Sequence, residues 1–284
     1  MRTSAIIVNY NDGENLINAV HRMSSYEIID DVIVVDNNSS DGSVDKICDI
    51  AKVSVIRSEK NGGYGFGNNL GMQYAVRNLN ADYALIMNPD TEISESTVQA
   101  LLSAISGDNS VAVCAPVCIT PESSFAAPAA AWPIRVWHLE LFEHCPILRR
   151  IFAGKANYPK EYLTGSGSCE AGAVPGSCLM VDLKKIDSVG GYDENVFLYC
   201  EENILGYKLK EASYKTLLLK DEKYFHNHKP SLPGSGSMKR LKDSELYYFK
   251  KYLKVGGFKM FISRLLLSAA ELEVRIYSLC KKKK

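Results

Sequence analysis

The sequence predicts an α/β protein in which a mostly parallel central sheet is covered by helices on both faces. Segments of strand type alternate with segments of helical spacing over the first 119 residues, as in chains built from βαβ units. The strand segments are almost continuously apolar, for example VIVVD (32–36) and YALIM (83–87), and such strands are buried on both faces of a sheet. A helical segment is expected after the sheet, over residues 238–284.

The composition is that of an ordinary globular chain. Hydrophobic residues make up 46% of the 284 residues, and Lys+Arg and Asp+Glu both number 33, so net charge indicates no class of partner. We expect no nucleic-acid partner. The eight cysteines are scattered, unlike those of a short disulfide scaffold, which predicts reduced thiols in a cytosolic protein. The first apolar segment is too short for a signal peptide, and no stretch is long and uncharged enough to span a bilayer.

The first half of the chain is expected to supply five strands and four helices. Strands are predicted within residues 4–10, 30–43, 53–58, 82–88 and 111–119, and the second of them ends in a polar loop. Helices are predicted within residues 12–23, 44–51, 61–79 and 94–105. The candidate N-caps are Asp41 or Ser43 for the second helix and Ser94 or Ser96 for the fourth, because short polar side chains accept hydrogen bonds from a first turn.

The second half is less regular. Residues 120–170 predict an irregular insertion with a short helix over 135–152 and a basic patch at Arg149–Arg150. A turn, a strand and a helical turn are expected within residues 174–197. A helix is predicted at 200–212, a strand at 214–219 and a linker at 232–237. These divisions separate a first half at 1–119, a second half at 120–237 and a C-terminal segment at 238–284.

Four loops at the predicted strand ends are rich in small polar residues, namely residues 9–11, 36–40, 61–69 and 88–90. In open α/β sheets, ligands bind beyond the carboxyl ends of the strands. Asp36 ends a buried strand, where its carboxylate is placed either to accept hydrogen bonds from a ligand or to form an Asx turn. The glycine fingerprint of a dinucleotide-binding fold is missing, because Asn68 stands where a third glycine is needed.

The loop NGGYGFGNNLG (61–71) contains five glycines in eleven residues. Glycine costs backbone entropy unless a positive φ or a close approach requires it. A plain loop before a helix would not need so many, so we interpret this one as a wall of a nucleotide site.

Three further positions carry candidate chemistry. Asn88-Pro89-Asp90 follows a strand, where Asp90 would either shape a turn or offer a carboxylate to a hard divalent cation. Glu201 and Glu202 begin a helix, where they favour the helix dipole, and one of them could face a reacting hydroxyl as a base. Residues i and i+1 of a helix point in different directions, so at most one of the two faces the chemistry. His226 and His228 follow a strand and are either metal ligands or ordinary histidines.

Taken in order, these motifs resemble glycosyltransferase family 2, in particular its bacterial rhamnosyltransferase-like members that build surface polysaccharides. The resemblance rests on seven segments spread over residues 4–231: IIVNYN, VVDNNSSDGS, NGGYGFGNNLG, MNPDTEI, VPGSCLMV, GGYDENVFLYCEENILGYKL and HNHKPS. It implies a GT-A fold and an inverting transfer from a nucleotide-activated sugar. Residues 1–237 would then be the catalytic domain, with a nucleotide-binding half at 1–119 and an acceptor half at 120–237.

The resemblance also implies roles for individual residues. Asp90 would be the retained acid of the family's metal motif, with neutral Asn88 at the other position, and His226 would be a second contact to metal or diphosphate. Glu202 would be the general base, with Glu201 as the runner-up, where many members carry Asp. Donor binding is expected from Asn9, Tyr10, Asp36, Asn61, Gly63, Asn68 and Asn88, and Gly176 and Ser177 are expected on the acceptor side.

The implied partners are a nucleotide sugar, a divalent metal and a lipid-linked saccharide. The donor expected first is dTDP-rhamnose, ahead of UDP-hexoses and UDP-galactofuranose, with Mg²⁺ or Mn²⁺ as cofactor. The acceptor would be a growing O-antigen or capsule chain at the inner face of a bacterial cytoplasmic membrane. The alternative is a sugar-nucleotide-binding or scaffolding paralogue without catalysis, which the neutral Asn88 and the unusual Glu202 keep open.

The C-terminal segment has apolar residues in alternating steps of four and three, which is an a/d seam. Basic side chains flank this seam, and four lysines end the chain. The pattern is typical of a helix lying on an anionic membrane surface, and equally of a helix packed on its own domain or on a second subunit. The seam consists of Phe258, Ile262, Leu265, Ala269, Leu272, Ile276 and Leu279.

Overall fold

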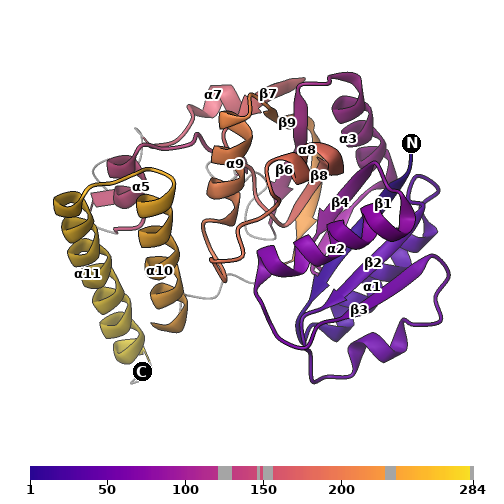
Figure 1. Ribbon diagram of the computed structural model, residues 1–284, viewed down its shortest axis with the longest axis horizontal. Helices are drawn as coiled ribbons and strands as arrows, with labels where there is room; N and C mark the ends of the chain where they lie inside the picture. The colour runs from indigo at the N-terminus through magenta and orange to yellow at the C-terminus, as the bar shows by residue number, and fades with distance from the viewer. Residues whose placement is uncertain (121–129, 146–147, 150–155, 228–234, 282–284) are drawn as a thin grey trace.

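The computed structural model describes residues 1–120, 130–145, 148–149, 156–227 and 235–281. These residues contain a nine-stranded sheet in the order β3-β2-β1-β4-β8-β6-β9-β5, with β7 also paired to β9 (Figure 1). The strands are β1 Thr3–Asn9, β2 Asp31–Asp36, β3 Val53–Arg57, β4 Tyr83–Met87, β5 Thr91–Ile93, β6 Val111–Ile119, β7 Ser168–Ala171, β8 Cys178–Asp182 and β9 Lys215–His226. The helices are α1 Gly13–Ser25, η1 Ser43–Lys46 (a 3₁₀ helix), α2 Tyr64–Leu79, α3 Glu95–Gly107, α5 Trp137–Glu143, α7 Lys160–Leu163, α8 Leu183–Ser188, α9 Glu201–Glu211, α10 Ser235–Lys251 and α11 Gly257–Lys281.

The sheet is parallel in its first half and mixed in its second. Strands β3, β2, β1 and β4 are parallel neighbours, as expected. Strand β8 is antiparallel to both β4 and β6, and β5 and β7 are antiparallel to β9. The expectation of a mostly parallel sheet therefore holds for the first half, and antiparallel β8 marks the change.

Two apolar layers cover the two faces of the sheet. Alternate residues of a strand face opposite sides, so Ile6 packs toward one cluster and Ile7 toward the other, both with 0% exposure. Helix α2 lies on the Ile6 side, where a Cβ at Gly71 would approach the Ile6 side chain to 2.5 Å. Glycine in α2 thus permits close helix–sheet packing, a structural role for part of the Gly-rich segment.

Several boundaries differ from the sequence expectations. The helix predicted at 44–51 is a single 3₁₀ turn at Ser43–Lys46, and the helix predicted at 135–152 is α5, Trp137–Glu143. Strand β9 continues beyond residue 219 to His226, where it pairs with β6 and β5. The polar residues of this extension are mostly at exposed or partly exposed positions. Helix α10 already begins at Ser235, inside the predicted linker, while His228 and Arg150 lie outside the described residues.

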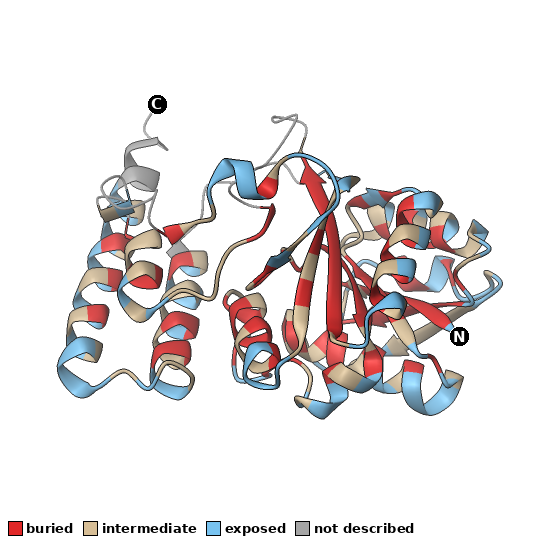
Figure 2. Ribbon diagram, turned by 90° about the horizontal axis from the view of Figure 1, so that it is seen from above, coloured by how far each residue is buried: buried red, intermediate tan, exposed pale blue. Residues whose placement is uncertain are grey.

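The C-terminal segment is a hairpin of two helices, α10 and α11, which lie side by side at one end of the molecule (Figure 1). One apolar cluster joins α5, α9, α10 and α11, and α11 enters it through Leu267, which is 1% exposed. The opposite side of α11 stays exposed (Figure 2). Large apolar side chains on that side are Phe258, Phe261, Leu265, Leu272 and Ile276, each more than half exposed at 77%, 58%, 55%, 56% and 54%.

The exposed side carries most of the predicted seam: Phe258, Leu265, Ala269, Leu272 and Ile276 are exposed, whereas Ile262 is half-buried. Self-packing of this helix therefore uses a different face, formed by Ser263, Leu267 and Ala270. Within the described residues, no helix is long and apolar enough to cross a membrane. The seven cysteines whose side chains the structure describes are all free thiols.

Candidate functional site

The carboxyl ends of β1 and β2 lie side by side, because Asn9 pairs with Asp36 in the parallel ladder. The Asn9 amide donates to the hydroxyls of Ser39 and Ser43, both at 3.1 Å. Asp36 is 4% exposed and accepts from the Ser39 backbone N–H at 3.2 Å, so it closes the loop as a turn residue would. Tyr10, which follows Asn9, is 53% exposed at the mouth of this loop.

The Gly-rich loop is fixed against the β2 loop by Asn37, a residue that the sequence did not single out. Its amide donates to the Gly63 carbonyl at 2.9 Å, and Asn61 accepts from the Gly63 N–H at 3.0 Å. Gly63 has φ +91° and a Cβ there would lie 2.1 Å from the Phe197 carbonyl oxygen. A side chain at position 63 is thus excluded by both backbone conformation and space.

Buried amide oxygens gather at this corner without completing their hydrogen bonds. The Oδ1 atoms of Asn9, Asn37 and Asn68 are buried and have no partner within the described residues. A buried acceptor left unsatisfied costs about 1–3 kcal/mol, and such groups call for an explanation such as a functional role. The polar loops therefore carry more hydrogen-bonding capacity than the fold itself uses.

Asp90 follows a turn in which the hydroxyl of Thr91 donates to the Asn88 carbonyl at 2.7 Å. Asn88-Pro89-Asp90 is therefore part of a turn, and this turn also places the Asp90 carboxylate next to His226. Asp90 Oδ1 lies 3.2 Å from His226 Nε2, because the β5–β9 ladder sets Thr91 opposite His226. Burial lowers the pKa of His226, but its hydrogen bonds to Asp90 and Cys118, together with the charges of these groups, outweigh burial and raise that pKa to about 9.

The Asp90–His226 pair fits a divalent cation by the chemistry of its donors. A carboxylate oxygen and an imidazole nitrogen, here 3.2 Å apart, are both groups that can ligate a divalent cation. Asp12, which the sequence analysis missed, interacts electrostatically with Asp90: burial raises the pKa of Asp12, and the charge of Asp90 raises it further. A cation bound at this pair would displace the His226 proton, since a ligating imidazole nitrogen is deprotonated.

The segment before β8 links Asn88 to Glu202. The Asn88 N–H donates to the Ser177 carbonyl at 2.9 Å, and the neighbouring Gly176 N–H donates to Glu202 Oε1 at 3.2 Å. Tyr64, another residue missed from the sequence, donates its hydroxyl to the Gly176 carbonyl. The two predicted acceptor-side residues therefore connect the Asn88 turn with the carboxylate of Glu202.

The two adjacent acids point into different surroundings, as their positions on a helix require. Glu201 is 3% exposed, and its Oε1 has no partner in the described structure. Glu202 is partly exposed and is held by Gly176. Burial raises the pKa of both carboxyls. The negative charge of Glu202 raises the pKa of Glu201 further. A raised pKa near the working pH suits a general base.

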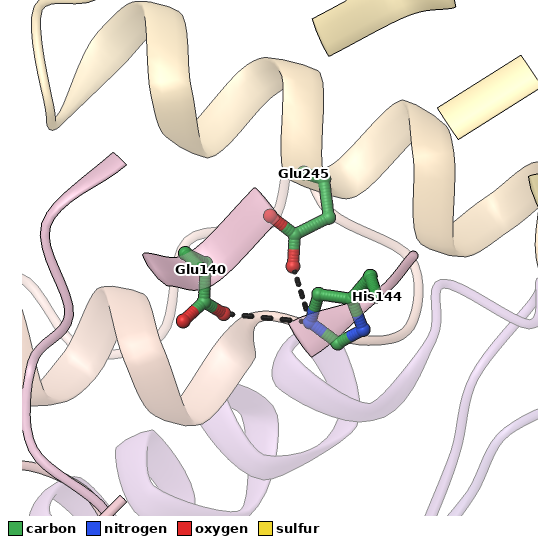
Figure 3. A group of neighbouring side chains, drawn as sticks. All are labelled: Glu140, His144 and Glu245. Atoms are coloured by element: carbon green, nitrogen blue, oxygen red, sulfur yellow. Dashed lines mark ion pairs between the residues drawn. The ribbon is translucent and has the colours of Figure 1, made fainter. Parts of the chain in front are cut away.

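A second polar cluster lies between α5 and α10 (Figure 3). His144 Nε2 lies 2.9 Å from Glu245 Oε1 and 3.5 Å from Glu140 Oε1, and Arg135 is paired with Glu140 at 3.0 Å. The nitrogen and the two carboxylate oxygens are close enough to hold a metal ion. Without one, a protonated His144 and Arg135 balance the two carboxylates, and Glu140 and Glu245 raise the pKa of His144 to about 10 against its burial.

Polar loops at the carboxyl ends of a parallel half-sheet, joined to a mixed second half, define a GT-A glycosyltransferase fold, and solved structures agree. GalNAc-T7 with UDP, GalNAc and Mn²⁺ matches with a TM-score of 0.63 and 16% identity, over 89% of this chain and 49% of that one. The mannosyltransferase PcManGT of Pyrobaculum calidifontis, with GDP-Man and Mn²⁺, matches at 0.61 and 13% identity, over 95% and 73%. S. aureus TarS with UDP-GlcNAc matches at 0.54 and 12%, over 97% and 74%.

The chain belongs to glycosyl transferase family 2, whose model matches residues 4–163. The low-salt glycan biosynthesis hexosyltransferase Agl10 of Haloferax volcanii is 28% identical over 74% of this chain. The N-acetylglucosaminyl-diphospho-decaprenol L-rhamnosyltransferase of Mycobacterium tuberculosis is 28% identical over 72% of it. The chain spans 62% of the length of the first relative and 68% of the second.

Proposed function

We propose that the protein transfers a sugar with inversion from a nucleoside diphosphate donor to a hydroxyl of a lipid-linked saccharide. One observation carries this proposal: hydrogen bonds through Ser177 and Gly176 connect the Asn88 turn, next to the Asp90–His226 pair, with the Glu202 carboxylate at the start of α9. A transferase of this kind needs a site for diphosphate charge beside a base for the acceptor hydroxyl. The two sites are linked here by backbone hydrogen bonds.

In this proposal, Glu202 removes the proton of the acceptor hydroxyl while that oxygen attacks the anomeric carbon. The new C–O bond forms on the face opposite the leaving group, so the configuration inverts. The bond from the anomeric carbon to the β-phosphate oxygen breaks, and its electron pair leaves with the nucleoside diphosphate. The Gly176 N–H, which donates to Glu202 Oε1, fixes the orientation of the carboxylate and leaves its other oxygen for the proton.

A divalent cation, Mg²⁺ or Mn²⁺, would be held by Asp90 and His226, with Asn88 and Asp12 beside them. It would supply positive charge next to the leaving diphosphate. On the donor side, Asn9, Asp36, Asn61 and Gly63 form the loops against which the nucleotide would lie. Exposed Tyr10 lies beside these loops, and buried Asn68 supports them from α2.

The nature of the donor is the most direct test of the first half of the proposal. Rhamnose is the preferred sugar because the mycobacterial relative is named an L-rhamnosyltransferase. With Mn²⁺ present, dTDP-rhamnose at 100 times its Kd should stabilise the folded protein by about 2.7 kcal/mol. A thermal-shift screen with dTDP-, UDP- and GDP-sugars measures this, and GDP-sugars provide the base-mismatched control. The absence of a shift with every nucleotide sugar would contradict the proposal.

The exposed face of α11 is proposed as the contact with the membrane that carries the acceptor. Phe258, Phe261 and Leu265 present apolar surface, and Arg264 and Arg275 lie on the same helix as cations for anionic headgroups. The mycobacterial relative is named for a decaprenol-linked acceptor, which would reside in such a membrane. A second copy of the chain on the same seam is the alternative occupant.

Changing Phe261 and Leu265 to Ser is expected to reduce binding to anionic vesicles at least about tenfold, because each apolar side chain buried in the interface contributes about 1.5–3 kcal/mol. Cosedimentation with phosphatidylglycerol-containing vesicles measures the effect. The matched control is the exposed Lys250→Ser on α10, which should bind as the wild type does. Equal vesicle binding by the double variant, or a concentration-dependent dimer that the double variant abolishes, would overturn membrane contact.

A further inference from the structure

The segment that leads into the two acids has a strained backbone at its end. Tyr199 and Cys200, directly before Glu201 and Glu202, have φ +73° and +67°. Non-glycine residues in this left-handed region cost about 1–3 kcal/mol each and persist only when their surroundings hold them. The start of α9 therefore depends on external contacts for its conformation.

Helix α10 supplies those contacts. The Ser244 hydroxyl donates to the Leu198 carbonyl at 2.8 Å, and the Cys200 thiol donates to Glu245 Oε1 at 3.2 Å. Ser244 and Glu245 are 5% and 0% exposed, so both bonds are shielded from water. Ser244 thus holds the chain at Leu198, just before the strained pair, and Glu245 holds it at Cys200, the second residue of that pair.

The other end of the segment is anchored to the same helix and to the turn that follows it. Asp193 is 8% exposed, and the hydrogen bonds that it accepts outweigh its burial and hold its pKa well below the usual range. Three donors from the α10 side converge on Asp193 Oδ2: Tyr247, Lys251 and Tyr252. The segment from Asp193 to Cys200 is therefore fixed at both ends by one element.

Beyond the acids, the α5–α10 cluster holds the first turn of α9. The Asn203 amide donates to Glu140, and Glu140 and Glu245 share His144 (Figure 3). Cys200, just before the acids, contacts Glu245, and Asn203, just after them, contacts Glu140. The two carboxylates of this cluster thus form hydrogen bonds with the residues on either side of Glu201 and Glu202.

We propose that Ser244 and Glu245 are positioning residues for the glycosyl transfer, which orient Glu202 by holding the strained Leu198–Cys200 backbone from α10. This inference rests on the proposed function, because it assigns Glu202 the role of base. Helix α10 then contributes to catalysis without touching substrate. The proposed donor loops at the ends of β1, β2 and β4 make none of these contacts, whereas the Gly-rich loop meets the same segment where the Tyr64 N–H donates to the Phe197 carbonyl at 3.2 Å.

The test replaces one hydrogen-bond donor side chain at a time. Cys200→Ala removes the thiol that meets Glu245, Cys200→Ser restores a donor there, and Ser244→Ala removes the hydroxyl that meets Leu198. Misplacing a catalytic group costs up to about 100-fold in rate, so both alanine variants should lower kcat about 10- to 100-fold with the donor KM unchanged. Cys200→Ser should recover most of the wild-type kcat, and exposed Asp243→Ala, next to Ser244, is the control.

Thermal melting and far-UV circular dichroism identify the variants that fold, and Ser244→Ala provides the test if Cys200→Ala does not. The inference is overturned if folded variants keep wild-type kcat, if KM for the donor rises instead, or if Cys200→Ser is no better than Cys200→Ala. Wild-type turnover is measured in the same experiment. Absence of wild-type transfer would contradict the proposed function, whereas wild-type transfer with unaffected variants would contradict only the positioning role.

Discussion

Glu202→Gln is expected to lower kcat about 100- to 10,000-fold, which is the usual contribution of a general base. Glutamine keeps the shape of the side chain and an oxygen that accepts from the Gly176 N–H, but it cannot take a proton. Donor affinity should stay close to that of the wild type, because the nucleotide loops are on other elements. Steady-state transfer kinetics, combined with calorimetric titration of the donor, separate the two effects.

Glu201→Gln is the matched comparison, since it removes the neighbouring and more buried acid. If Glu201→Gln is the inactive variant and Glu202→Gln transfers at the wild-type rate, the base is Glu201. The pH profile adds an independent check. A base must be ionised and burial raises the pKa of Glu202, so wild-type kcat should fall as pH decreases, with a midpoint above that of an ordinary Glu. Residual Glu202→Gln activity should lack this acid limb.

Asp90→Asn is expected to lower metal-supported transfer about 100- to 1,000-fold, the range for losing one electrostatic contact to developing charge. Asparagine fits the turn but removes the negative charge paired with His226 at 3.2 Å. Wild-type activity should disappear in EDTA and return with Mn²⁺ or Mg²⁺, and the variant should need more metal. Exposed Asp49→Asn is the charge-matched control. Full wild-type activity in chelator would contradict a metal at this pair.

The parallel half of the fold could be predicted because its strands are continuous apolar segments, as buried strands must be. The second half carries weaker signals. Strands β5 and β7 are only three and four residues long, and half or more of their residues are polar. Strand β9 has partly exposed positions along its length. Such strands are defined by their partners, which a local pattern does not report.

The candidate site was predictable where residues sit in strand-end loops. Asp90 and His226 were both selected, and the structure brings them together. Asn37 and Tyr64 were not, because each acts through a bond to a backbone carbonyl of a distant residue, Gly63 and Gly176 respectively. Whether Asp36 binds a ligand or closes a turn could not be read from its position, and the bond from Ser39 shows that it closes the loop.

The C-terminal helix shows a different limit of sequence patterns. Its seam had the correct period, but α11 is apolar on two opposite faces, and the pattern did not indicate which face packs on the domain. The face containing Leu267 enters the core cluster, and the face containing Leu265 stays exposed. The positive φ angles of Tyr199 and Cys200 could not be predicted from the sequence either, because neither residue type favours a positive φ.

The product of transfer tests the central claim most directly. The purified protein would be incubated with dTDP-rhamnose, Mn²⁺ and a short-chain polyprenyl-diphospho-saccharide, and the product analysed by mass spectrometry and by NMR of the anomeric centre. The expected product is a lipid-linked saccharide one sugar longer, with the donor's anomeric configuration inverted and one nucleoside diphosphate released per transfer. A retained configuration, or donor binding without transfer or hydrolysis across the panel of nucleotide sugars, would contradict it.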